Sequence, residues 1–143
     1  MKLVDINVLA YLVIESQFSK NAQKLYRLDS EWHTEEFAFI ELTNVLTTHL
    51  RAGSLTMPVC IETFEEAENV IGSNLHTVSH LDALAIAHEF RISAYDAPSI
   101  SLARRLGVPR IAEDKQLRKV VQALTMSNDE ARGKLENAPS SLR

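Results

Sequence analysis

The stretch MKLVDINVLAYLV, residues 1–13, holds a carboxylate and an amide, Asp5 and Asn7, inside an otherwise apolar segment. Residues 2–4 have the composition of a short buried strand, and residues 7–14 carry apolar side chains at the spacing of one helix face. Burying an ionised carboxylate is costly unless a cation or hydrogen-bond donors compensate its charge. We therefore expect Asp5, at the junction of strand and helix, to reach the surface or to meet a positive group.

Short strands alternate with helices along the rest of the chain. We expect strands near residues 2–4, 32–34, 75–78, 108–112 and 124–126, and helices over residues 7–14, 19–28, 35–51, 62–71, 81–90, 96–106 and 115–124. This order is typical of an α/β domain with a mainly parallel central sheet. In such sheets ligands bind beyond the carboxyl ends of the strands, so a functional site is expected there.

Length and composition place the chain among ordinary globular proteins. Its 143 residues, 45% apolar and 24% charged, suit one domain, which we assign to residues 1–127, with residues 128–143 as a loosely attached tail. No apolar run approaches a membrane-spanning length and no secretory signal is recognisable, so a cytoplasmic location is expected. The net charge of −4 argues against binding nucleic acid through bulk positive charge, unless bound divalent cations reverse the local charge.

Four acidic residues lie at or near the expected carboxyl edge of the sheet. Asp5, Asp96 and Asp114 each lie near the start of a helix, and Glu41 lies in mid-helix beside the apolar face. The alternative for each aspartate is a helix N-cap, and for Glu41 it is a solvated helix edge. Four unpaired carboxylates in one cleft would repel one another, and Mg²⁺ or Mn²⁺ would relieve that repulsion. The chemistry expected is metal-assisted attack of water on a phosphodiester.

Four motifs together resemble a known family. DINVL (5–9), IELTNVL (40–46), YDAPSISLARRLGVP (95–109) and EDKQL (113–117) are similar, in order and spacing, to the PIN-domain pattern of small VapC-type ribonuclease toxins of type II toxin–antitoxin pairs. The resemblance covers about residues 1–125. It implies a three-layer α/β/α fold with a short, mainly parallel sheet. It also implies RNA cleavage that depends on Mg²⁺ or Mn²⁺, a small antitoxin partner and a homodimer.

The resemblance also assigns roles to particular residues. The positions that match the family's metal-binding acids are Asp5, Glu41, Asp96 and Asp114. The positions that match its frequent polar neighbours of those acids are Asn7 and Asn44. Ile6 and Ala112 depart from the pattern, since hydroxyl residues are common at both positions. By this resemblance, the missing hydroxyl at residue 112 weakens the positioning of water or metal near Asp114.

Basic residues near the last motif are candidates for phosphate contacts, with Arg104, Arg105 and Lys115 as the principal ones. The same segment also carries Arg110, Arg118 and Lys119, and the alternative for all of these is an ordinary solvated helix charge.

Two other functions remain open at this point. A catalytically weak PIN-fold module that binds RNA or a protein partner is favoured by Ala112 and by the acidic net charge. A phosphatase using Asp5 is a weaker alternative, because Asn7 stands where a D-x-D motif requires the second aspartate. His76 and His80 are four residues apart, but a strand-to-helix boundary separates them, which disfavours a histidine metal site.

Overall fold

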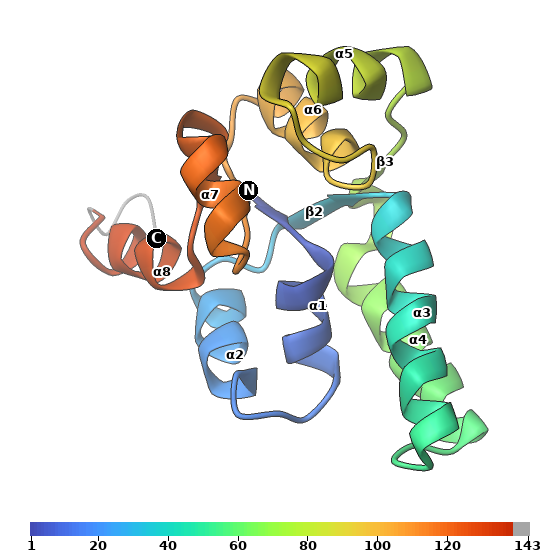
Figure 1. Cartoon of the computed structure of the whole chain (residues 1–143). Coiled ribbons are helices and arrows are strands. Elements are labelled where there is room, and N and C mark those ends of the chain that lie inside the picture. Colours follow the sequence, from blue (N-terminus) through green and yellow to red (C-terminus); the bar gives the residue numbers. More distant parts are fainter. Residues whose placement is uncertain (139–143) are drawn as a thin grey trace.

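The computed structural model describes residues 1–138. Its centre is a five-stranded parallel sheet with helices on both faces (Figure 1). The strand order is β3-β2-β1-β4-β5. The strands are β1 (Lys2–Val4), β2 (Trp32–Glu35), β3 (Leu75–His76), β4 (Arg110–Ile111) and β5 (Thr125–Met126). The α/β/α layering and the parallel sheet expected from the sequence are confirmed.

The helices follow the strands in the order expected for parallel pairing. They are α1 (Ile6–Val13), α2 (Ser19–Leu28), α3 (Phe37–Ala52), α4 (Met57–Ile71), α5 (His80–Phe90), α6 (Ala97–Leu106), α7 (Lys115–Val120) and α8 (Asn128–Glu136), with short 3-10 turns at Gly72–Asn74 and Gln122–Leu124. None of the helices within residues 1–138 is both long and apolar enough to cross a membrane.

The register between strands decides which side chains share a face of the sheet. Leu3 of β1 is aligned with His33 of β2 and with Arg110 of β4, whereas Val4 is aligned with Ile111. Aligned residues on parallel strands point to the same side, and successive residues point to opposite sides. His33 and Arg110 therefore lie on the Leu3 face, and Ile111 lies on the Val4 face.

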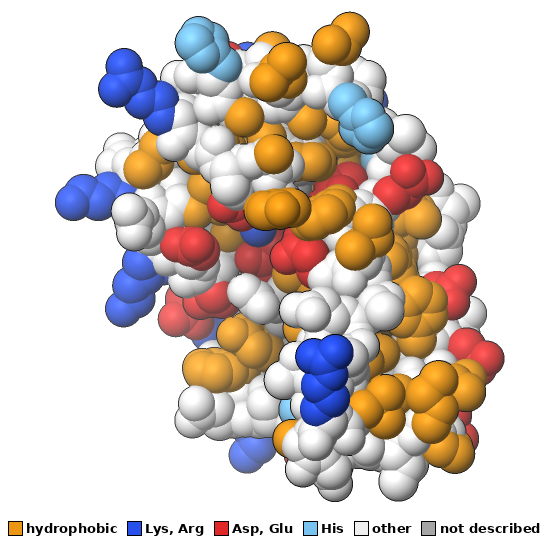
Figure 2. Space-filling view, turned by 45° about the vertical axis from the view of Figure 1, so that its right-hand side comes forward, with side chains coloured by type: hydrophobic (Ala, Val, Ile, Leu, Met, Phe, Trp, Pro, Cys, Tyr) orange, Lys and Arg blue, Asp and Glu red, His pale blue; other side chains and the backbone are white. Residues whose placement is uncertain are grey.

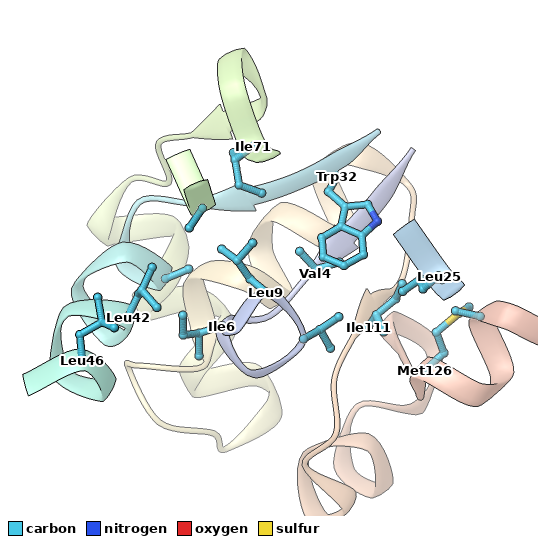
Figure 3. Close-up of a cluster of buried hydrophobic side chains, with 14 of the residues drawn as sticks. Val4, Ile6, Leu9, Leu25, Trp32, Leu42, Leu46, Ile71, Ile111 and Met126 are labelled. Atoms are coloured by element: carbon cyan, nitrogen blue, oxygen red, sulfur yellow. The ribbon is translucent and has the colours of Figure 1, made fainter. Parts of the chain in front are cut away.

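The Val4 face carries the larger core. Val4, Ile111 and Trp32 pack there against buried side chains of α1, α2, α3, α4 and α8 (Figure 3). The Leu3 face is covered by α6, because Leu3 packs against Leu102 and Ala103 of that helix. Helices α5, α6 and α7 share a further apolar cluster on this side. The inner strands β1, β2 and β4 are therefore covered on both faces, as is usual for parallel sheets, whereas Leu75 of the edge strand β3 is exposed.

Helix α4 begins earlier than expected. We expected Pro58 to break the chain before a helix at residue 62, but α4 begins at Met57 and holds Pro58 in its first turn. Proline is tolerated there because its missing N–H has no partner within the helix and its fixed φ suits a helix start.

The expected loose tail contains a packed helix. Ser127 and Glu130 form a reciprocal capping box at the start of α8. Ala131 is fully buried, and Leu135 packs against the main core. Ala131 and Leu135 thus pack toward α2 and the main core, which a count of apolar residues does not reveal. Residues 139–143 of the expected tail lie outside the described part of the chain.

Candidate active site

The carboxyl ends of the two central strands β1 and β2 place two acids on one face of the sheet. Asp5 follows β1 and lies two residues after Leu3, and Glu35 ends β2 two residues after His33. Because alternate residues share a face, both carboxylates extend toward the side covered by α6. Each residue is only 4% exposed. Two nearly buried carboxylates thus lie where an open parallel sheet binds its ligands.

Asp5 is both a helix cap and a site residue. Its Oδ1 accepts a hydrogen bond of 2.9 Å from the Val8 N–H in the first turn of α1. Its Oδ2 lies 3.5 Å from Nη2 of Arg110. Burial raises the pKa of the Asp5 carboxyl, although Arg110 and the Val8 N–H oppose that shift. Of the two outcomes expected for Asp5, an exposed carboxylate or a positive partner, the structure shows the second, and capping uses only one of its two oxygens.

Arg110 is the cation at the centre of the site. Its side chain is 8% exposed, and its Nη1 lies 3.4 Å from Oδ1 of Asp96. Asp96 immediately precedes α6, and its Oδ2 accepts a hydrogen bond of 3.0 Å from the Ser93 hydroxyl. Arg110 belongs to the segment whose basic residues were considered as phosphate contacts or as solvated helix charges. It is not a solvated helix charge, because it lies on β4 and the register directs its side chain inward beside Asp5.

Glu41 completes the group from α3. It is half-buried, and burial is the main cause that raises the pKa of its carboxyl to about 7. Arg110 lowers that pKa, whereas the negative charges of Glu35, Asp5 and Asp96 raise it. The structure therefore brings three of the four acids chosen from the sequence, Asp5, Glu41 and Asp96, into one electrostatic group.

Glu35 is an acid of the site that sequence reasoning missed. Its Oε2 accepts a hydrogen bond of 2.6 Å from the Phe37 N–H, and burial raises the pKa of its carboxyl. We had assigned Glu35 to the start of a helix, whereas β2 extends through it. The alternation of WHTE over residues 32–35 was the available signal, because a strand ending at Glu35 points its side chain to the same face as His33.

Asp114 is placed differently from the other acids. It is exposed, and its Oδ1 accepts hydrogen bonds of 2.9 Å from the Gln116 N–H and 3.0 Å from the Leu117 N–H. The negative charge of its neighbour Glu113 contributes to raising the pKa of Asp5. The contacts described for Asp114 make it the N-cap of α7, which is the alternative left open by the sequence.

Substitutions at Asp114 are expected to show a capping role. Asp114→Ala should lower the free energy of unfolding by about 1 kcal/mol, because two N–H groups of α7 lose their acceptor. Asp114→Asn should change it by a few tenths of a kcal/mol, since asparagine caps helices as well as aspartate does. Urea unfolding at neutral pH measures both values. Equal destabilisation by alanine and asparagine would contradict this role.

Two of the three cations proposed for phosphate contact lie at the end of α6 opposite to Asp96. Arg104 lies in the last turn of α6, about 12 Å along the helix axis from Asp96. Its guanidinium makes two hydrogen bonds, of 2.8 and 2.9 Å, to Glu89. Arg105 lies in the same last turn, while Lys115 is the exposed first residue of α7. Of the three, Lys115 alone follows the carboxyl end of a strand.

The two asparagines proposed as neighbours of the acids are both exposed. Asn7 lies in the first turn of α1 after Asp5, and Asn44 lies one helical turn after Glu41 on α3. Ala112 is fully buried at the end of β4, and its N–H donates to the Met126 carbonyl of the neighbouring strand. Two residues after Arg110, Ala112 is directed to the same face of the sheet as Arg110 and Asp5.

The donor set fits a hard divalent cation that keeps much of its water. The group contains several carboxylates but one cation, Arg110, so negative charge is in excess. Mg²⁺ characteristically uses one or two carboxylates together with waters and phosphate oxygens. Within residues 1–138, no group of three acidic, histidine or cysteine side chains is close enough to form a ready-made metal site. The described geometry thus suits an ion held by one or two carboxylates better than a closed all-protein site.

Comparison with known proteins identifies the family. The model of the PIN domain family matches residues 2–122. The chain is a PIN-domain protein. It is also 30% identical over 128 residues to Ribonuclease VapC3 of Pyrobaculum aerophilum, a match that covers 87% of this chain and 98% of that protein. The family resemblance inferred from the four motifs is thereby confirmed.

A solved structure supports the fold of this PIN domain. The crystal structure of PAE2754 from Pyrobaculum aerophilum superposes with a TM-score of 0.75 and covers 96% of this chain and 90% of that one. Sequence identity to it is 16%, so this likeness concerns the arrangement of the backbone alone.

An apolar cavity of about 580 Å³ adjoins the acidic group of the PIN domain. Glu35 lines it together with Phe37 and Tyr95, whose rings stack at 5.5 Å, and with the exposed side chains of Ile40 and Leu81. Acidic side chains gather in the middle of this face below a band of hydrophobic ones (Figure 2). The site therefore combines a carboxylate cluster with apolar and aromatic surface beside it.

Proposed function

We propose that the protein is an endoribonuclease that uses Mg²⁺ or Mn²⁺ to hydrolyse phosphodiester bonds in RNA. The observation that carries the proposal is the grouping of Asp5, Glu41 and Asp96 at the carboxyl end of the sheet. The family assignment and the ribonuclease name of the Pyrobaculum relative support it. Glu35 adds a fourth carboxylate that the sequence resemblance did not include.

The proposed role of each acid depends on which of its carboxylate oxygens is free to bind the metal ion. Asp5 would bind the ion through Oδ2, because the cap of α1 uses Oδ1. Asp96, at the start of α6, and Glu41, on α3, would hold the same ion directly or through water. The bound ion would lower the pKa of an attacking water and stabilise charge on the phosphate oxygens. No side chain is required to act as a nucleophile. Asp114, whose Oδ1 caps α7, would complete the group of acids through its Oδ2.

Cleavage of single-stranded RNA tests the proposal. Purified protein should cut a pool of fluorescent RNA oligonucleotides in the presence of Mn²⁺ or Mg²⁺, lose the activity in EDTA, and regain it when the metal is restored. An Asp96→Asn protein purified in parallel detects contaminating nuclease, because it lacks one of the proposed metal ligands. Cleavage that persists unchanged in EDTA, or no cleavage of any RNA, would refute the proposal.

Protein partners form a second part of the proposal. We infer from the family a cytoplasmic toxin that forms a homodimer and is held inactive by a small antitoxin. Apolar surface of the kind that protein interfaces need is present around the cavity, where Ile40, Leu81 and Leu84 are 62%, 77% and 66% exposed. Light scattering on the purified chain measures its oligomeric state, and a monomer at all concentrations would contradict the homodimer.

A catalytically weak binding module remains the second candidate. Arg110 lies between Asp5 and Asp96, and the described residues contain no preformed three-ligand site. Both observations favour weak metal binding. Calorimetric titration with Mn²⁺ separates the two functions, because a module that only binds RNA or protein requires no metal at these carboxylates.

A further inference from the structure

Arg110 reaches the acidic group from the interior of the sheet. Strand β4 lies between β1 and β5, and its alignment with Leu3 turns the Arg110 side chain toward the face that also carries Asp5. The side chains of Arg110 and Asp5 are 8% and 2% exposed, whereas that of Asp96 is 36% exposed. The guanidinium is thus buried, and it lies between a buried carboxylate, Asp5, and a partly exposed one, Asp96.

The contacts of this guanidinium are loose. Its distances of 3.5 Å to Asp5 and 3.4 Å to Asp96 exceed the 2.7–2.9 Å or so of a strong charge-assisted hydrogen bond. Arg104, in the same chain, makes two bonds of 2.8 and 2.9 Å to a single carboxylate. The Nε of Arg110 is buried, and no hydrogen-bond partner for it is found among the described residues. Arg110 therefore offsets the negative charge of Asp5 and Asp96 but forms no short hydrogen bond to either carboxylate.

The position between the carboxylates is also the one that a divalent cation would take. The positive charge of Arg110 acts on Asp5, Glu35 and Glu41. A divalent ion attracted to the same oxygens meets a positive charge already in place, and like charges in a poorly solvated site repel strongly.

We propose that Arg110 is a built-in counter-ion that holds the site carboxylates together without metal and competes with a divalent cation for Asp5 and Asp96. This inference rests on the proposed function, because it takes the same carboxylates as metal ligands. Binding of the ion requires the guanidinium to leave at least one of them. Arg110 is in this sense a positioning residue that sets the metal affinity.

Direct Mn²⁺ titration tests the inference without measuring catalysis. Calorimetry should show that Arg110→Leu binds Mn²⁺ about 10- to 100-fold more tightly than the unaltered protein, because a nearby unit charge is removed. Arg110→Lys retains the charge and should stay within about threefold of the unaltered protein. Arg51→Leu, at the exposed far end of α3, removes one positive charge from the surface and should leave the affinity unchanged.

The outcome of the titration either supports or overturns the proposed role of Arg110 as a counter-ion. Arg110→Gln, which removes the charge but keeps polar contacts, replaces the leucine variant if that one fails to fold by circular dichroism. Mn²⁺ binding that is unchanged or weaker in the charge-removing variant, or absent from every protein, overturns the inference. If Arg110→Leu binds Mn²⁺ more tightly but the unaltered protein never cleaves RNA, the proposed function fails and this inference stands. If RNA is cleaved and the affinity does not rise, only the inference fails.

Discussion

Replacing Asp5 with asparagine is expected to lower the kcat of Mn²⁺-dependent RNA cleavage by about a hundred- to a thousandfold while the fold is retained. Asparagine is an effective N-cap, so its side-chain oxygen can still accept the Val8 N–H at the start of α1. The negative charge that faces Arg110 and the proposed ion is lost. The substitution thus separates the two roles of Asp5, because capping survives and metal binding does not.

Initial rates on a fluorescent RNA substrate at saturating Mn²⁺ measure this effect, and thermal unfolding of the same samples measures the fold. The matched control is Asp82→Asn, which removes one carboxylate from the exposed first turn of α5. It should leave both the rate and the unfolding temperature unchanged. Full activity in the Asp5→Asn protein would show that Asp5 is only a cap and that the proposed site is wrong.

The metal-free protein is expected to become less stable as the pH rises from about 5 to about 8. The folded-state pKa of Glu41 is about 7, above the ordinary glutamate value of 4.5, so the folded state binds more protons than the unfolded state between these two pH values. The free energy of unfolding therefore falls as pH rises through that window. After a discount for the partial exposure of Glu41, the loss is about 1–2 kcal/mol. The raised pKa values of Asp5 and Glu35 act in the same direction.

Urea unfolding in EDTA at several pH values measures this slope, and Glu41→Gln should reduce it because glutamine does not titrate. The comparison is needed because His76, whose pKa is lowered, contributes the opposite slope in both proteins. Added Mn²⁺ should restore stability at high pH, since it binds the ionised carboxylates. An identical slope in the Glu41→Gln protein would contradict the assignment of the pH effect to this residue.

The fold was largely predictable because its signals are local. The alternation of short apolar strands with periodic helices indicated the parallel α/β class, and each expected strand was found within a few residues of its expected place. The errors arose where local pattern and packing differ. Helix α8 has few apolar residues, but those it has are aligned on one side, with Ala131 fully buried.

The site was predictable in part, for a related reason. Asp5 and Asp96 adjoin helix starts that the sequence marks, and Glu41 stands out as a carboxylate beside an apolar helix face. Asp114 carries the same local signal as Asp5, yet it caps α7 at an exposed position. A helix start next to a strand therefore does not tell whether the acid is buried beside other charges or exposed at the surface.

The sequence by itself determined the order of the elements, the parallel sheet and three acids of the candidate site, because strand and helix periodicities depend on neighbouring residues. Only the tertiary structure decided that Glu35 joins those acids and that Arg110 lies among them. Both outcomes depend on the register that aligns Leu3 with His33 and with Arg110. That register is set by packing between segments far apart in the chain, since a shift of one residue would turn both side chains to the opposite face of the sheet.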